Sequence, residues 1–223
     1  MFSQQKSQLR LWQLISPTLP IGSFAYSQGL EYAVESGWVD SEKKTAEWIK
    51  GQIRKTLSTL DIPVMRRLYD AWQSEDKDKI LYWNQWLLAA RESKELYDED
   101  IQLGQSLNRV LKGLNINLPI DDDIEWSYTA MFAYASVKWE IPFVDSATGW
   151  LWAWSENQVA AAVKLVPLGQ TSGQNILSEV LEEIPAAIEA TKNFSDDEIG
   201  VLAPGLGIAS ALHETQYSRL FRS

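Results

Sequence analysis

Three acidic side chains, Asp121, Asp122 and Glu125, have the spacing in this chain that best suits metal chemistry. Carboxylates three or four residues apart on one helix can share a hard cation such as Mg²⁺, which in turn can hold a diphosphate. Pro119 comes just before them and indicates that a helix begins here. Because acidic residues cap free amides and are stabilised at the start of a helix, capping explains the same pattern without a metal, and we favour it.

Few other residues of the chain could take part in catalysis or bind a cofactor. His213 is the single histidine, so a multi-histidine metal site is impossible, and we expect it at the surface or in an interface. The glycine-bearing stretch PLGQTSGQ, residues 167–174, lacks the lysine of a phosphate-binding loop and is expected to connect two helices. We therefore expect no enzyme here: no catalytic residues, no bound cofactor and no metal ligands.

Composition limits the partners. The chain has 223 residues, a formal net charge of -10 and no cysteine. A surface this acidic repels nucleic acid and anionic membranes, and disulfides and thiolate metal sites are excluded. No stretch approaches the ~20 apolar residues that span a bilayer, and the N-terminus does not look like a secretory signal. We expect a soluble, cytoplasmic protein.

Apolar residues recur at helical spacing along most of the chain, and no comparable alternation predicts a sheet. The clearest stripe consists of Ile124, Tyr128, Met131, Phe132, Ala135 and Trp139. Others run through residues 46–60, 96–110 and 177–188, the first with Asp40 and Ser41 as N-cap candidates. Proline and glycine separate these stretches. The sequence predicts an all-α fold, a single domain over residues 1–223 with about eight to ten helices around a central buried helix.

One stretch is ambiguous between strand and helix. Trp150, Trp152 and Trp154 alternate as in a strand, but helical spacing continues through Gln158 to Leu165. We interpret this stretch as a helix. Because it is apolar on most sides, we expect it to be the central buried one.

Three segments look like contact surfaces. In SPTLPIGSFAYSQGLE, residues 16–31, Gly29 suggests close approach by another helix, Ser23 a helix N-cap, and the later Gly37 a helix stop. A partner surface and a corner within one core explain this segment equally well. Around residues 157–174, Lys164 near a helix end can reach an acidic partner, whereas the amides before it favour an internal hydrogen-bond network.

The third segment, HETQYSRLFRS, residues 213–223, mixes aromatic residues with arginine, as binding hot spots do. Either it is a short interaction tail or it folds back onto its own core.

These segments are also where the chain resembles the UreF family of urease accessory proteins. SPTLPIGSFAYSQGLE, KLVPLGQTSGQ and HETQYSRLFRS are similar to family signatures and occur in the family's order. RESKEL, residues 91–96, is similar to a fourth segment, although Tyr97 stands where the family leads us to expect arginine. The likeness extends almost from end to end.

The resemblance implies an all-helical homodimer without catalytic residues of its own. Such a protein binds a UreD-type partner, also called UreH, and with it recruits the GTPase UreG. The assembly supports GTP-dependent delivery of nickel into apo-urease, so this chain is a scaffold and regulator with an indirect role in nickel insertion. On this basis the partner-binding residues are expected to be Tyr26, Glu31, Lys164, Gln170, Tyr217, Arg219, Leu220, Phe221 and Arg222.

The alternative is an all-helical isoprenoid-synthase-like enzyme in which Asp121, Asp122 and Glu125 hold magnesium. Its usual second metal-binding motif is missing, and the chain is short for that class. A purely structural helical oligomer is a third possibility.

Overall fold

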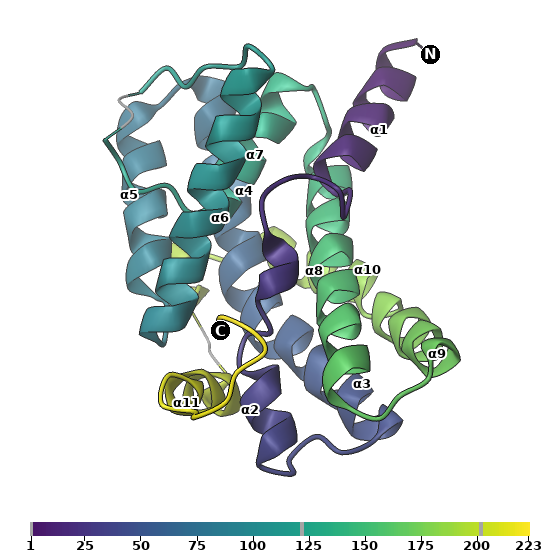
Figure 1. The fold of residues 1–223 in the computed structure, drawn as a ribbon. Coiled ribbons are helices and arrows are strands. Elements are labelled where there is room, and N and C mark those ends of the chain that lie inside the picture. The colour runs from purple at the N-terminus through teal and green to yellow at the C-terminus, as the bar shows by residue number, and fades with distance from the viewer. Residues whose placement is uncertain (1, 121–122, 201–202) are drawn as a thin grey trace.

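The computed structural model describes residues 2–120, 123–200 and 203–223, and in these residues the regular structure is helical throughout (Figure 1). The all-α prediction is confirmed. The elements are α1 (Phe2–Leu14), η1 (Ser23–Ala25), α2 (Leu30–Glu35), α3 (Glu42–Gln52), η2 (Ile53–Asp61), α4 (Ile62–Ser74), α5 (Lys77–Ala89), α6 (Lys94–Gly113), α7 (Tyr128–Lys138), α8 (Phe143–Leu165), α9 (Gln170–Leu181), α10 (Ile184–Ala190), η3 (Thr191–Asn193), η4 (Asp196–Glu198) and α11 (Pro204–His213).

The helices α3 and α4 are joined without a break by η2, a π-helical stretch. Pro63 lies just after it and has no amide hydrogen to give, and its ring crowds the carbonyl four residues earlier. That carbonyl, of Thr59, instead accepts the Gly200 amide at 3.0 Å. Ser41 caps the start of the continuous helix formed by α3, η2 and α4, as the sequence predicts, by accepting the Lys44 amide. The π-helical stretch η2 ends at Asp61, a buried carboxylate that lines the cavity described below.

The most deeply buried helix is α7, in which every residue from Thr129 to Ser136 is buried. It packs between α4 and α6, where Trp72 on α4 donates its indole hydrogen to the Ala130 carbonyl at 3.1 Å. The expected central helix therefore exists. It is α7 rather than the 150–165 helix, because small alanines let its neighbours close in on every side.

The start of α7 differs from the prediction. Its N-cap is Ser127, which accepts the Ala130 amide, so Ile124 and Glu125 precede the helix instead of opening it. Asp121 and Asp122 lie outside the described residues.

The three alternating tryptophans lie on α8, so the helical interpretation of that stretch is confirmed. This helix runs past α9, α10, α2 and η1 (Figure 1). Trp152 and Trp154 are only partly buried, and Trp154 lines the cavity described below.

The short helix α2 and the last helix, α11, lie side by side although they are far apart in the sequence (Figure 1). Gly29 permits this contact: a Cβ there would lie 3.0 Å from the Ser210 nitrogen. The predicted close approach is confirmed, but Gly29 is the left-handed N-cap of α2 and not an interior residue. Gly37 follows the end of α2 with a φ of 77°, as a helix stop.

Ser23 does not cap α2 as expected; it opens η1. Among the described helices, none combines the length and the apolar character that a membrane crossing requires.

Candidate functional site

The last five residues, 219–223, fold back onto the chain, and we call them the C-terminal segment. Its backbone is fixed at two points, by the last residue of η1 and by a residue that follows it. The Arg222 amide donates to the Ala25 carbonyl at 2.8 Å, and the Ser27 amide donates to the Ser223 carbonyl at 2.8 Å. The chain end thus lies against α2 and η1, close to α6 and α11 (Figure 1). Of the two explanations open from the sequence, folding back applies to this part.

A single buried carboxylate organises the segment. Glu31, in the first turn of α2, accepts the Leu220 amide at 2.6 Å and the Phe221 amide at 2.8 Å. A buried carboxylate is costly unless its oxygens are paired, and here backbone amides pair both of them. Glu31 and the C-terminal segment therefore fix each other's position.

His213 extends this network. Its Nε2 lies 3.1 Å from Glu31, and its Nδ1 lies 2.7 Å from Glu95 on α6. Glu95 in turn accepts a hydrogen bond from Arg219 at 2.7 Å. The expectation of a surface or interface histidine is wrong, because the ring is fully buried between the two carboxylates. Both ring nitrogens are engaged, which leaves neither as a base for a nucleophile.

The segment is also anchored by an aromatic side chain. Phe221 is buried in a small apolar cluster with Leu30, Val39 and Val166. The ammonium of Lys164 lies 5.5 Å from the centre of the Phe221 ring, a cation–π arrangement. Position 164 near the end of α8 is thereby tied to the chain terminus.

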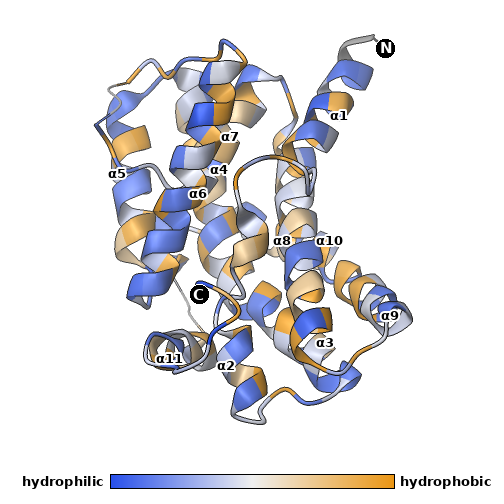
Figure 2. Cartoon of the chain, in the orientation of Figure 1, coloured by the Kyte–Doolittle hydropathy of each residue, from blue (hydrophilic) through white to orange (hydrophobic). Residues whose placement is uncertain are grey.

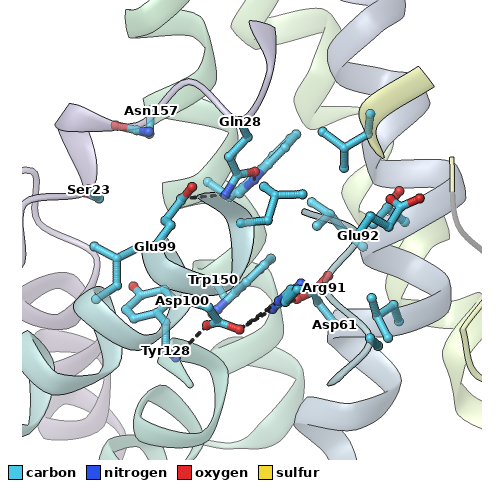
Figure 3. Close-up of a pocket in the computed structure, with 18 of the residues that line it drawn as sticks. Ser23, Gln28, Asp61, Arg91, Glu92, Glu99, Asp100, Tyr128, Trp150 and Asn157 are labelled. Carbon is cyan, nitrogen blue, oxygen red and sulfur yellow. Dashed lines mark hydrogen bonds and ion pairs between the residues drawn. The ribbon is translucent and has the colours of Figure 1, made fainter. Parts of the chain in front are cut away.

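A cavity of about 100 Å³ lies beside the C-terminal segment and is lined by residues of α6, α8, η2 and the α5–α6 connection (Figure 3). In its wall, Arg91 bonds Asp61 at 2.8 Å and Asp100 at 2.8 Å. Asp100 also accepts the Tyr128 amide at 2.7 Å, at the start of α7, where the helix dipole favours negative charge. Burial raises the pKa of Asp61, and the Arg91 guanidinium opposes that rise.

Glu99 joins the cavity to the C-terminal segment. Its carboxylate accepts hydrogen bonds from Gln28 and from the Ser223 hydroxyl, both at 2.7 Å. Gln28 in turn accepts the indole hydrogen of Trp154 at 2.8 Å, and the Gln28–Glu99 contact is drawn in Figure 3. Burial raises the pKa of Glu99 to about 7. The chain terminus is thus bonded directly to a titratable group of the cavity wall.

The structure brings most of the predicted partner-binding residues together. Tyr26, Glu31 and Phe221 are buried, whereas Lys164, Leu220 and Arg222 surround them at the surface. Tyr217 is fully exposed on the approach to the segment. Gln170 is exposed at the start of α9, and within the part of the chain that the structure describes it forms no hydrogen bond with the segment. Whether any of them binds a partner stays a prediction.

Sequence reasoning did not single out Glu95, Glu99 or Ser27 as parts of this site. The stretch RESKEL did carry a signal, because it contains Arg91 and Glu95, which face the cavity and the C-terminal segment respectively. Tyr97, the departure from the expected arginine, donates its hydroxyl to Glu125 at 2.8 Å. Asn157 donates to the Tyr26 carbonyl at 3.2 Å, in line with the internal network favoured from the sequence.

In the described part of the chain, no three histidine, cysteine, aspartate or glutamate side chains are arranged to hold a metal ion. The fold and the site define a class of all-helical protein in which the C-terminal segment is docked on η1, α2 and α6.

The comparisons with known proteins make this class specific. The UreF family model matches residues 39–181. The urease accessory protein UreF of Alkalilimnicola ehrlichii is 51% identical over 219 residues, covering 97% of this chain and 96% of that protein. Those of Marinobacter nauticus and Pseudoalteromonas translucida are 46% and 42% identical, and cover 96% and 99% of this chain and 94% and 96% of their own.

The chain belongs to the UreF family of urease accessory proteins. It is accordingly an accessory protein and not a catalyst. The isoprenoid-synthase alternative is not favoured, since near-full-length identity assigns the whole fold, including the stretch around Glu125, to this family.

Proposed function

We propose that this protein is a scaffold and regulator of urease maturation. With a UreD/UreH-type partner it recruits a UreG-type GTPase and supports GTP-dependent insertion of nickel, the cargo of the assembly, into apo-urease. The observation that carries this proposal is the 51% identity, over 97% of the chain, to a protein named as a urease accessory protein. Identity at this level over nearly the whole chain supports a shared role in urease maturation.

The exposed residues around the C-terminal segment form the proposed contact surface. Tyr217 and Leu220 are exposed and apolar, and Arg219 keeps 41% of its side chain exposed while bonded to Glu95. Aromatic, apolar and arginine side chains presented together supply much of the binding energy in protein interfaces. Lys164 and Arg222 extend the same surface, with Gln170 as a more distant member.

The buried residues have a different part in the proposal. Tyr26, Glu31 and Phe221 contribute by fixing the backbone on which the exposed side chains are presented. A preformed surface lowers the entropy cost of binding, since fewer rotatable bonds lose their freedom when the partner binds.

Recruitment of the GTPase tests the proposal. A Lys164→Ala, Arg219→Ala double variant should recover at least about tenfold less GTPase than wild type in a pull-down with the UreD/UreH-type partner present. The exposed Lys43 serves as the control, and Lys43→Ala should recover wild-type amounts. Undiminished recruitment by the folded double variant contradicts the assignment of these two residues.

We further propose that the protein is a homodimer, as the family resemblance implies, and that it acts in the cytoplasm with these partners. Light scattering of the purified chain should give twice the chain mass of 25.3 kDa. A mass of one chain at all concentrations contradicts the dimer without affecting the scaffold proposal.

A further inference from the structure

A second hollow lies on the outer side of the C-terminal segment, between α6 and the residues that form η1. It encloses about 270 Å³, and we call it the arginine groove. We propose that the arginine groove binds an acidic segment of a partner protein. The inference rests on the proposed function, because that partner belongs to the maturation assembly. The residues used in the argument are Phe24, Gln102, Gln105, Ser106, Arg109 and Arg222.

One wall of the arginine groove is a single face of α6. Gln102, Gln105, Ser106 and Arg109 recur there at intervals of three, one and three residues, which places them on one side of the helix. The outer face of α6 is mostly hydrophilic (Figure 2). Arg109 is exposed, and it donates to the Ser106 hydroxyl at 2.8 Å. This guanidinium is thus oriented by its own helix.

The opposite wall is fixed by the C-terminal segment. The Arg222 amide donates to the Ala25 carbonyl at 2.8 Å, so its backbone cannot move independently of η1. Next to it, Tyr26 donates its hydroxyl to Gln102 at 2.7 Å, which ties this wall to α6. The Arg222 side chain is exposed at the groove. Two arginines on separate elements are therefore held at one hollow.

Within the described residues, neither Arg109 nor Arg222 forms an ion pair with a carboxylate, so no carboxylate there neutralises their charge. The chain has 30 acidic and 20 basic residues, and these two arginines lie at one hollow. The groove therefore brings two positive charges together on a chain whose net charge is -10.

A second basic hollow offers a comparison. It lies beside α4 and encloses about 390 Å³. There Arg66 pairs with Asp70, Arg67 with Asp196, and Lys192 with Glu189. Its cations are compensated internally, so it lacks the charge that a ligand could neutralise. The arginine groove differs in this respect.

The chemistry of the groove specifies the partner. A guanidinium presents paired donors that match a carboxylate, and charge-assisted bonds of this kind are the stronger ones. Phe24 is 66% exposed at the same hollow and offers an aromatic face to an apolar neighbour of the acidic residue. A nucleic acid fits less well, because the net charge of -10 repels an extended polyanion, whereas a short acidic segment meets only the local charge.

Charge reversal tests the groove in the intact chain. Binding of purified UreD/UreH-type protein and of the GTPase is measured by calorimetry for wild type and for the Arg109→Glu, Arg222→Glu double variant. We expect the double variant to bind at least one of them about tenfold or more weakly. The control is Lys43→Glu, Lys77→Glu, which changes the net charge equally at exposed positions in the first turns of α3 and α5. The control should stay within about twofold of wild type.

The outcomes separate this inference from the proposed function. If wild type binds and the double variant binds both proteins equally well, the groove inference alone is overturned. If wild type binds neither protein, the proposed function fails, and the groove inference fails with it.

Zero-length cross-linking identifies the bound group. An Arg109→Lys, Arg222→Lys variant keeps the charge and introduces amines that a carbodiimide joins only to carboxyl groups in contact. We expect mass spectrometry to find an amide bond from position 109 or 222 to an aspartate or glutamate of the partner. Absence of such a bond in the assembled complex overturns the inference. If inorganic phosphate binds at the groove in that case, the ligand of the two arginines is a small anion.

Discussion

At the scale of single residues, Glu31 shows how one side chain can join two distant parts of the chain. It accepts backbone amides from residues 189 and 190 positions away, and it lies beside the buried His213. A buried carboxylate left without these donors pays a large desolvation cost. Docking of the C-terminal segment and the packing of α2 should therefore depend on each other.

Replacing this carboxylate tests that dependence. Glu31→Gln removes the charge that strengthens the two amide hydrogen bonds, and should weaken docking of the segment by about 1.5–3 kcal/mol. Hydrogen exchange at the Leu220 and Phe221 amides should be accelerated by roughly tenfold or more. Glu35→Gln, at the exposed end of the same helix, is the matched control. Equal protection in the two variants contradicts this account of the segment.

Glu99 makes stability depend on pH. Its pKa is about 7 in the folded chain, against 4.5 as the reference value, because burial disfavours the charged form. The folded state therefore holds this proton more tightly, and the contribution is full below pH 4.5 and lost as pH rises through about 7.

Glu99→Gln should remove this loss, which is on the order of 1–3 kcal/mol between pH 5 and 8. Urea unfolding at several pH values measures it, with Glu35→Gln as the control that keeps the wild-type slope. An unchanged slope in Glu99→Gln shows that another group is responsible.

The sequence could predict which residue types surround the chain terminus, but not their roles. Tyr217 and Phe221 look equivalent in a mixed aromatic and arginine stretch, yet one is fully exposed and the other is buried. The difference follows from Glu31, which fixes the backbone at residue 221 from a distant helix. Local patterns do not contain such long-range partners, so His213 was also misplaced.

At the scale of elements, close backbone contacts depend on glycine. Gly104 in α6 is one case: a Cβ there would lie 2.0 Å from the Trp126 carbonyl oxygen, in the segment that leads into α7. Backbone cannot yield as a flexible side chain can. Gly113, at the end of the same helix, has no atom of the described residues within 4 Å of the corresponding position.

The two glycines form a matched pair. Gly104→Ala should lower the free energy of unfolding by about 3 kcal/mol or more, because α6 and the segment before α7 must separate. Gly113→Ala should be neutral or stabilising by up to about 1 kcal/mol, since alanine favours helix. Thermal unfolding measures both. A similar loss in the two variants contradicts the close contact at Gly104.

Periodicity predicted the elements better than their arrangement. The stripes in residues 46–60 and 150–165 became helices, because apolar spacing fixes which side of a helix is buried. The π-helical stretch η2 was not foreseen, since it depends on how Pro63 is accommodated inside a continuous rod. Nor could periodicity rank α7 above α8 in burial, because that depends on which neighbours surround each helix.

At the scale of the whole molecule, the C-terminal segment and the acidic cavity form one connected unit. Ser223 bonds Glu99, and Glu99 lines the cavity that also contains the Arg91 ion pairs. Undocking the segment would expose one side of this wall. A partner that stabilises the docked segment would therefore also stabilise the cavity, through contacts already present in the chain.

Complementation tests the central claim most directly. A bacterium that normally has active urease, and from which its own UreF-family gene has been deleted, receives this chain, its Tyr217–Ser223 deletion, or the Alkalilimnicola ehrlichii relative as positive control. Urease activity and urease-bound nickel are then measured. We predict that the full chain restores both and that the folded deletion variant restores neither. Restoration by the relative but not by the full chain, or by the deletion variant as fully as by the full chain, would contradict the claim.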